Sequence, residues 1–279
     1  GHVARLIEAR KADHIHIVTE GPLGIMARRY CRNAGRPFTT SYHTRFPEYL
    51  SARLPVPESW AYRWLRDFHN SGQGTLVATQ SLADDLSARG FNKLRPWTRG
   101  VDTDHFRPDK RKDLGFPGPV FLCVGRVAIE KNLSAFLDLD LPGSKVIVGE
   151  GPELAKLRAK YPKAHFLGHR PNDELAEIYA SADVFVFPSR TDTFGNVIIE
   201  ALASGTPVAA YPVTGPIDIV GDGFGGAVSN DLREASLAAL KVDRAEARER
   251  AMRYSWKACA EMFLDTVEEA LGMPRRLAA

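Results

Sequence analysis

Two acidic residues stand eight positions apart in the stretch SRTDTFGNVIIEALASGTPVAAYP, which covers residues 189–212. Asp192 lies in a polar turn, and Glu200 lies in an apolar run that is typical of a buried helix. Eight helical residues span about 12 Å, so the two carboxylates cannot easily share one proton, as a glycosidase pair must. They could instead hold the two ends of an elongated ligand whose middle is anionic, and a nucleotide sugar is such a ligand.

The turn between the two acids is itself suited to an anion. Gly195 allows the backbone to approach a ligand closely, and Thr193 or a neighbour can cap the expected helix, residues 194–203. The amides of Gly195, Asn196 and Val197 would then point at the anion.

A second turn, in CVGRVAIEKN (residues 123–132), places two cations at the entrance of another expected helix. Arg126 and Lys131 would lie there beside backbone N–H groups that have no partner within the helix, and this arrangement makes an anion site. Solvated surface charges are the alternative interpretation.

Both turns belong to a chain in which strands alternate with helices, and this pattern predicts parallel sheets covered on both faces. Residues 95–119 are rich in Pro, Gly and charge and are the best linker candidate. We therefore expect an α/β fold with two Rossmann-like domains, residues 1–100 and 101–255, followed by a helix, residues 256–279, that packs back on the first domain. Ligands of open α/β sheets lie beyond the carboxyl ends of the strands, where both turns are expected.

Composition narrows the classes of function. The net charge of +3 and the pI near 8.7 fit anionic small ligands or an acidic membrane surface and are too weak to argue for nucleic acid. Cys31, Cys123 and Cys259 are scattered, which favours reduced thiols in the cytoplasm. No apolar run approaches the roughly 20 residues of a membrane span. The stretch WAYRWLRDF, residues 60–68, predicts an amphipathic helix that packs on its sheet, with a membrane-surface or lipid-acceptor role as the alternative.

Four segments together resemble the retaining glycosyltransferases of family 4, which have the GT-B fold. GRVAIEKN (residues 125–132) resembles their Gly-Arg-x4-Lys-Asn diphosphate turn, and DTFGNVIIEA (192–201) resembles their E-x7-E signature. RGVDTDHFRP (99–108) resembles the interdomain segment, and YHT (42–44) resembles the His-bearing turn of the first domain. The longer stretches TEGPLG, SYHTRFPEYL, W-x-RGVD and TDTFGNV look closest to those of GDP-mannose-dependent α-mannosyltransferases and sulfolipid-forming glycosyltransferases.

The resemblance implies a retaining, metal-independent hexosyltransferase without a cofactor. Its donor would be a GDP- or UDP-linked mannose- or glucose-type sugar, and its acceptor a hydroxyl of a lipid or a glycan. It implies a cytoplasmic protein that can also make peripheral contact with the inner face of the membrane, and no nucleic-acid partner. The implied site residues are Arg126 and Lys131 on the diphosphate, Glu200 on the ribose hydroxyls, Asp192 with the amides of Phe194, Gly195 and Asn196 on the donor sugar and phosphate, and His43 on the donor sugar.

Two features depart from the family pattern. Asp192 stands where the family usually has Glu, and its side chain is one methylene shorter. A complete member begins with a strand and a Gly-rich turn tens of residues earlier, so we expect the first domain to be incomplete here. A nucleotide-sugar-binding protein without transfer activity and a nucleotide-sugar epimerase of the same fold are therefore the alternatives.

The site residues also have structural interpretations. Glu200 could be buried with a structural partner, Asp192 could only cap its helix, and His43 could be an ordinary packed histidine. Two Asp-x-Asp sequences, at residues 102–104 and 138–140, match a metal motif of other glycosyltransferases. The first lies in the linker and the second near a helix end, so we expect no metal site at either.

Overall fold

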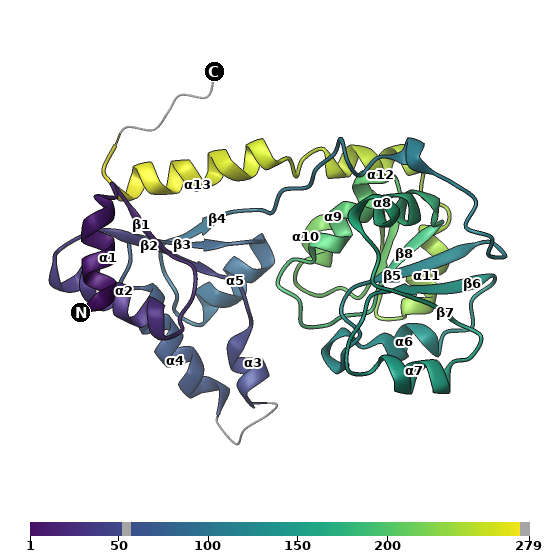
Figure 1. Cartoon of the computed structure of the whole chain (residues 1–279), viewed down its shortest axis with the longest axis horizontal. Coiled ribbons are helices and arrows are strands. Elements are labelled where there is room, and N and C mark those ends of the chain that lie inside the picture. Colours follow the sequence, from purple (N-terminus) through teal and green to yellow (C-terminus); the bar gives the residue numbers. More distant parts are fainter. Residues whose placement is uncertain (52–56, 274–279) are drawn as a thin grey trace. The chain divides into compact units, whose positions relative to one another are not determined.

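The computed structural model describes residues 1–51 and 57–273 and divides the chain into two compact units. Unit 1 comprises Gly1–Thr98 and Cys259–Ala279, and unit 2 comprises Arg99–Ala258. Each unit contains one parallel sheet and helices that pack against it (Figure 1). The predicted α/β fold with parallel sheets is confirmed.

Unit 1 has a four-stranded sheet in the order β1-β2-β3-β4. Its strands are β1 (Ile15–Ile17), β2 (Phe38–Tyr42), β3 (Gly74–Val77) and β4 (Leu94–Pro96). Its helices are α1 (His2–Arg10), α2 (Pro22–Asn33), α3 (Phe46–Ser51), α4 (Glu58–His69), α5 (Gln80–Ala88) and, from Cys259 on, α13 (Trp256–Ala270).

The two faces of the unit 1 sheet pack against different helices, because successive strand residues point to opposite sides. Tyr42 packs with Leu65 of α4 and Leu82 of α5 on one face. On the other face, the ring of His16 meets the ring of Phe263 of α13 edge-on, at 5.0 Å between centroids. The helix α13 therefore covers the face that carries the odd-numbered side chains of β2.

Unit 2 has a six-stranded sheet in the order β10-β9-β8-β5-β6-β7. Its strands are β5 (Val120–Val124), β6 (Ser144–Val148), β7 (His165–Gly168), β8 (Val184–Phe187), β9 (Val208–Ala210) and β10 (Gly226–Val228). The chain runs from β5 outward to β7, returns to β8 beside β5, and then runs outward to β10. The strand order thus reverses between β5 and β8, which is the position where doubly wound sheets bind ligands.

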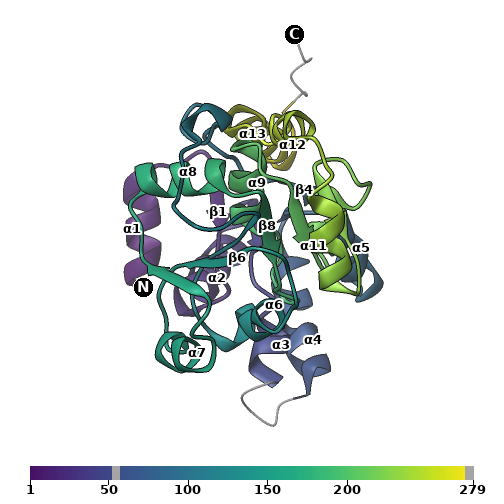
Figure 2. The ribbon, with the colours of Figure 1, turned by 90° about the vertical axis from the view of Figure 1, so that its right-hand side faces the viewer.

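Helices cover both faces of this sheet, as Figures 1 and 2 show for α6 and α7 on one side and α8 and α9 on the other. The helices are α6 (Leu133–Leu137), α7 (Leu154–Lys160), α8 (Asn172–Ser181), α9 (Asn196–Ala203), α10 (Pro216–Val220), α11 (Leu232–Ala239) and α12 (Arg244–Ala251), with 3-10 turns at Pro108–Lys110 and Ile129–Lys131. Phe121, Phe136, Leu157 and Ala235 belong to one buried cluster that joins β5 to α6, α7 and α11.

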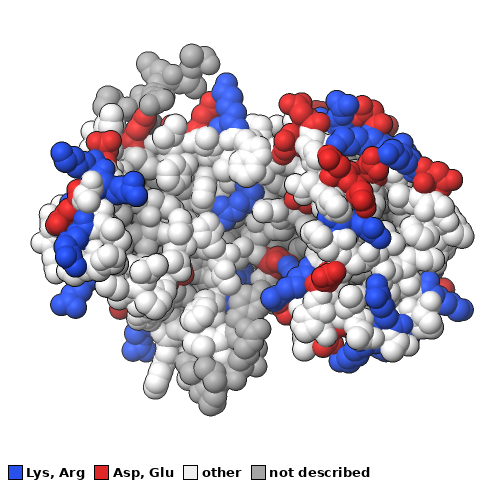
Figure 3. Space-filling model, viewed as in Figure 1, with Lys and Arg blue, Asp and Glu red and all other residues white. Residues whose placement is uncertain are grey.

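The side chains on one face of the molecule show how its charges are distributed. On the face shown in Figure 3, basic and acidic side chains are interspersed. Among the helices of the described residues, none combines the length and the apolar character that crossing a bilayer requires.

Candidate functional site

The turn after β5 is a backbone surface that glycine makes possible. Gly125 and Gly149 have φ angles of 147° and 137°. A Cβ atom on Gly149 would lie 1.9 Å from the carbonyl oxygen of Gly125, so the turns after β5 and β6 can approach only without a side chain there. A Cβ on Gly125 would meet no atom within 4 Å, so this turn faces open space.

A cavity of about 290 Å³ lies at this turn, between the carboxyl ends of β5 and β8. The residues that line it include Gly125, Arg126, Lys131, Pro188, Ser189 and Val197. The cavity is therefore at the point where the strand order reverses, and its size is near the lower end for small-molecule sites.

The structure brings Lys131 and Asp192 together, although 61 residues separate them. Lys131 Nζ donates to both carboxylate oxygens of Asp192, at 2.7 and 2.9 Å. Asn132 Nδ2 donates to the carbonyl oxygen of Pro188 at 3.0 Å and joins the same two turns. Asp192 thus partly neutralises Lys131, and an anion that binds Lys131 must share it with this carboxylate.

Arg126 lines the cavity but is more exposed than Lys131. Its side chain is 64% exposed, against 29% for Lys131, and it forms an ion pair with Glu130. Only a short helix follows these two cations: Asn132 adopts a left-handed conformation, with φ of 52°, and α6 spans five residues. The predicted helix start after Lys131 and Asn132 is therefore confirmed, although the helix is short, and the 3-10 turn Ile129–Lys131 positions Lys131.

The helix α9 begins at Asn196, two residues later than expected, and its N-cap is Gly195. Of the expected candidates, Thr193 or a neighbour, the N-cap is the neighbour Gly195, which has φ of 90° and makes no side-chain cap bond; Asp192 is therefore not the N-cap. A Cβ on Gly195 would lie 3.0 Å from Ile198 Cδ1, so the position favours glycine on two grounds. The amides of Asn196 and Val197 thus open a helix whose N-cap supplies no side-chain acceptor.

Glu200 lies on α9 with a partner that the sequence did not indicate. The hydroxyl of Tyr179 donates to Glu200 Oε2 at 2.9 Å. Burial raises the pKa of Glu200, while the bond from Tyr179 and the charge of His105 lower it. The rule that a buried acid needs a partner predicts such a contact, but nothing local singles out a tyrosine 21 positions earlier.

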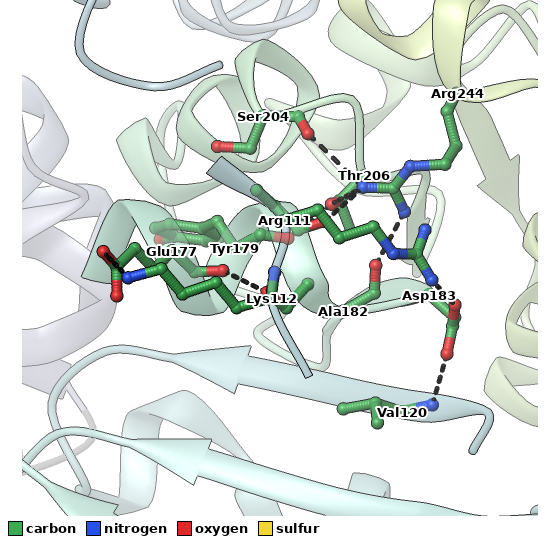
Figure 4. Close-up of polar contacts among 12 residues, drawn as sticks. Arg111, Lys112, Val120, Glu177, Tyr179, Ala182, Asp183, Ser204, Thr206 and Arg244 are labelled. Carbon is green, nitrogen blue, oxygen red and sulfur yellow. Dashed lines mark hydrogen bonds and ion pairs between the residues drawn. The ribbon is translucent and has the colours of Figure 1, made fainter. Parts of the chain in front are cut away.

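A network around Arg244 of α12 joins the end of α8 to the segment that precedes β9 (Figure 4). The guanidinium donates to the carbonyl oxygens of Ala182 and Ala180 at 2.7 and 2.6 Å. Thr206 Oγ1 donates to the carbonyl oxygen of Tyr179 at 2.6 Å. Burial lowers the pKa of Arg244 to about 10, which leaves it charged at neutral pH. Thr206 thus holds the backbone of Tyr179, and Arg244 holds the backbone that follows it.

His43 belongs to unit 1 and directly follows β2. Its Nε2 lies 2.6 Å from Ser41 Oγ, and its ring centroid lies 5.8 Å from the ring of Trp97. The structure thus places His43 at the carboxyl end of a parallel strand, which is where functional residues of such sheets occur. It also gives His43 packed neighbours, as the structural interpretation expects.

The acids of the two Asp-x-Asp sequences make structural contacts. Asp102 Oδ1 accepts from the backbone N–H groups of Asp104 and His105, at 3.0 and 2.9 Å. Asp138 Oδ1 accepts from the hydroxyl of Tyr161 at 2.6 Å. Within residues 1–51 and 57–273, no three His, Cys, Asp or Glu side chains gather in a way that could hold a metal ion.

Comparison with known proteins assigns both halves of the chain. Residues 118–242 match the family model described as Glycosyl transferases group 1, and residues 1–105 match the model of Glycosyltransferase Family 4. The crystal structure of HepE from Anabaena in complex with UDP has a TM-score of 0.75 at 16% identity, over 96% of this chain and 82% of that chain.

Sequence relatives match most of this chain. A GDP-mannose-dependent alpha-mannosyltransferase of Mycobacterium tuberculosis is 35% identical over 225 residues, which are 77% of this chain and 60% of the relative. The sulfoquinovosyl transferase SQD2 of Arabidopsis thaliana is 35% identical over 230 residues, which are 75% of this chain and 44% of the relative. The chain thus spans 60% or less of the length of these two relatives.

Proposed function

Because this chain belongs to the group 1 and family 4 glycosyltransferases and has their GT-B fold, we propose that it is a retaining hexosyltransferase. It moves a mannose- or glucose-type sugar from a nucleoside-diphosphate sugar to a hydroxyl of a lipid or glycan acceptor. One observation carries the proposal: Lys131 and Val197, in the first turn of α9, line the cavity at the point where the strand order reverses, and Glu200 follows Val197 on the same helix.

The cationic side of the site serves the leaving group. Negative charge grows on the diphosphate as the glycosidic bond breaks. Cations and amides that already point at the diphosphate stabilise this charge, because they need not reorganise during the reaction. Lys131 and the amides of Asn196 and Val197 supply the fixed part, and the more exposed Arg126 adds to it. Asp192 orients Lys131 and would also accept from a hydroxyl of the donor sugar.

Glu200 serves the ribose. Tyr179 donates to its Oε2, which fixes the carboxylate and leaves Oε1 to accept from ligand hydroxyls. By analogy with the family's retaining mechanism, the acceptor hydroxyl attacks from the side of the leaving group. The diphosphate itself then takes the acceptor's proton.

The acceptor side of the proposal rests on α4. Trp60 and Trp64 are one helical turn apart and are 66% and 43% exposed, and the exposed Arg63 lies between them. An exposed aromatic pair beside a cation suits the interface of an anionic membrane, so we propose that the chain acts at the inner face of the membrane. The three cysteines are free and buried, which is consistent with a reducing compartment.

Vesicle binding tests the membrane contact. The Trp60→Ser/Trp64→Ser variant should cosediment less with anionic vesicles than the wild type, and neutral vesicles should bind both chains weakly. Equal binding of variant and wild type to anionic vesicles would remove α4 from the interface.

A thermal-shift panel of GDP, UDP and their mannose and glucose conjugates tests the function itself. A nucleotide at 100 times its dissociation constant should stabilise the protein by about 2.7 kcal/mol, and EDTA should not abolish the shift. Donor conversion with retained anomeric configuration then separates the transferase from the alternatives. Binding without turnover would indicate a binding protein, and interconversion of the donor itself would indicate an epimerase.

A further inference from the structure

Three histidines and two hydroxyl groups form one hydrogen-bonded chain in unit 1. His14 Nε2 and His16 Nδ1 both lie 2.8 Å from Thr39 Oγ1. His16 Nε2 lies 3.2 Å from Ser41 Oγ, and Ser41 Oγ lies 2.6 Å from His43 Nε2. This chain, called here the histidine relay, runs without a break from the start of β1 to the ring of His43 at the end of β2.

The protons of the histidine relay can be counted. Each hydroxyl has one proton and lies between two ring nitrogens, so it can donate to only one of them. A neutral imidazole has one donor nitrogen and one acceptor nitrogen. Burial, and then the charge of Arg36, lower the pKa of His14. Burial, and then the charges of His14 and His43, lower the pKa of His16 to about 4, so both rings are neutral near pH 7. If every bond is made, the donors must point in one direction along the relay.

The free end of the relay decides the direction. Among the described residues, the buried Nδ1 of His14 has no hydrogen-bond partner. If His14 donates to Thr39 from Nε2, this nitrogen is a lone pair; in the opposite direction it is an N–H. A buried N–H without a partner is the rarer and less favourable case. Donation therefore runs from His14 to Thr39, from Thr39 to His16, from His16 to Ser41 and from Ser41 to His43.

We propose that the histidine relay fixes the tautomer of His43, whose Nε2 accepts from Ser41 and whose Nδ1 carries the ring proton. His16 and Ser41 are then positioning residues for His43. The rings of Trp97 and Phe263 flank His16 edge-on, at 6.2 and 5.0 Å between ring centroids, and limit the movement of its ring. With its proton on Nδ1, the ring of His43 donates from that nitrogen and accepts through Nε2.

Nitrogen NMR of the full chain labelled with ¹⁵N-histidine tests the proposal, because ring nitrogens with and without a proton differ in chemical shift. Near neutral pH and without nucleotide, we expect His43 to be the Nδ1–H tautomer and His14 and His16 to be Nε2–H tautomers. A proton on Nε2 of His43, in a neutral or a charged ring, would overturn the proposal. The measurement needs no donor, so it can fail independently of the proposed function.

Variants separate the relay from general packing. Ser41→Ala removes the hydroxyl that donates to His43, and His16→Phe keeps a ring but removes the group that orients Ser41. In both, His43 should become a mixture of tautomers. Unchanged Nδ1–H in both variants would show that the relay does not set the tautomer.

The matched control is Thr40→Val, on the same strand but the opposite face, where Thr40 Oγ1 lies 2.8 Å from His69 Nδ1. It should leave His43 unchanged. His105 of unit 2 is an internal reference, because its Nε2 lies 3.1 Å from the carbonyl oxygen of Asn172 and must carry a proton there. Thermal melting confirms that each variant folds.

Discussion

At the scale of single residues, Lys131 is the cation that we expect to contribute most to phosphate binding. It is partly buried, whereas Arg126 is largely exposed to screening by solvent. Lys131→Ala should weaken binding of a nucleoside diphosphate by about 1.5–3 kcal/mol, the range for hydrogen bonds to charged groups. Arg126→Ala should cost only about 0–1 kcal/mol, like other exposed pairs. Calorimetry that finds Lys131→Ala equal to the wild type would remove Lys131 from the site.

Substitutions of Asp192 and of Glu200 should change the affinity for different parts of the donor. Glu200→Gln should weaken the bare nucleoside diphosphate and the sugar nucleotide alike, because both contain ribose. Asp192→Asn should weaken only the sugar nucleotide or its turnover. Because it also removes the charge that neutralises Lys131, it should tighten the bare diphosphate by up to about 1 kcal/mol.

Calorimetry of both variants with the bare diphosphate and with the sugar nucleotide tests whether Glu200 binds the ribose and Asp192 binds the sugar. Equal weakening of the two ligands by Asp192→Asn would contradict it.

The raised pKa of Glu200 predicts how binding depends on pH. Burial is the main cause of the raised pKa, so the carboxylate begins to protonate at a higher pH than an exposed glutamate. Only the ionised form can accept from two hydroxyls through one carboxylate, so affinity for the nucleotide should fall as the pH decreases below neutral, and this fall should begin at a higher pH than for an exposed glutamate. Glu200→Gln should lose this part of the pH dependence. The phosphate of the ligand titrates equally in both proteins and cancels in the comparison.

At the scale of the elements, Arg244 is the charged side chain that we expect to stabilise unit 2 most among those drawn in Figure 4. Arg244→Met keeps much of the stem but leaves the carbonyls of Ala180 and Ala182 without their donor. The free energy of unfolding of unit 2 should fall by about 2–4 kcal/mol, because each unsatisfied buried group costs about 1–3 kcal/mol.

Lys112→Met is the matched control, because Lys112 pairs with Glu177 at the surface, where its side chain is 62% exposed. It should change the free energy of unfolding by no more than about 1 kcal/mol. Urea unfolding followed by a probe in unit 2 measures the free energy of unfolding of both variants. Similar losses in Arg244→Met and Lys112→Met would contradict the role of Arg244.

The elements also show how far the sequence alone can go. The apolar run around Ile198 and Ile199 predicted a buried helix, and both residues are fully buried. Its first turn was placed two residues early, because a glycine cap with positive φ is not distinguished from a loop glycine by residue type. The Lys131–Asp192 and Glu200–Tyr179 contacts were not predicted, because they depend on which strands are neighbours, and alternation of strands and helices does not specify that order.

At the scale of the whole molecule, the account assigns the nucleotide to one of two units. The turns after β5 and β8 and the helix α9 all belong to unit 2, residues 99–258. A ligand that binds only the folded form of a unit stabilises that unit by mass action and slows the opening of the backbone that it contacts. Nucleotide binding should therefore slow the exchange of backbone amide hydrogens in the segments that contact the ligand.

Hydrogen–deuterium exchange of the full chain, with and without a saturating nucleoside diphosphate, tests this assignment most directly. We predict slower exchange in residues 123–132 and 188–200, where Lys131, Asp192 and the first amides of α9 lie. The same experiment with Lys131→Ala should show less protection in both segments at equal ligand concentration. Unchanged exchange in these two segments under conditions where calorimetry detects binding, or protection confined to residues 1–98, would contradict the account.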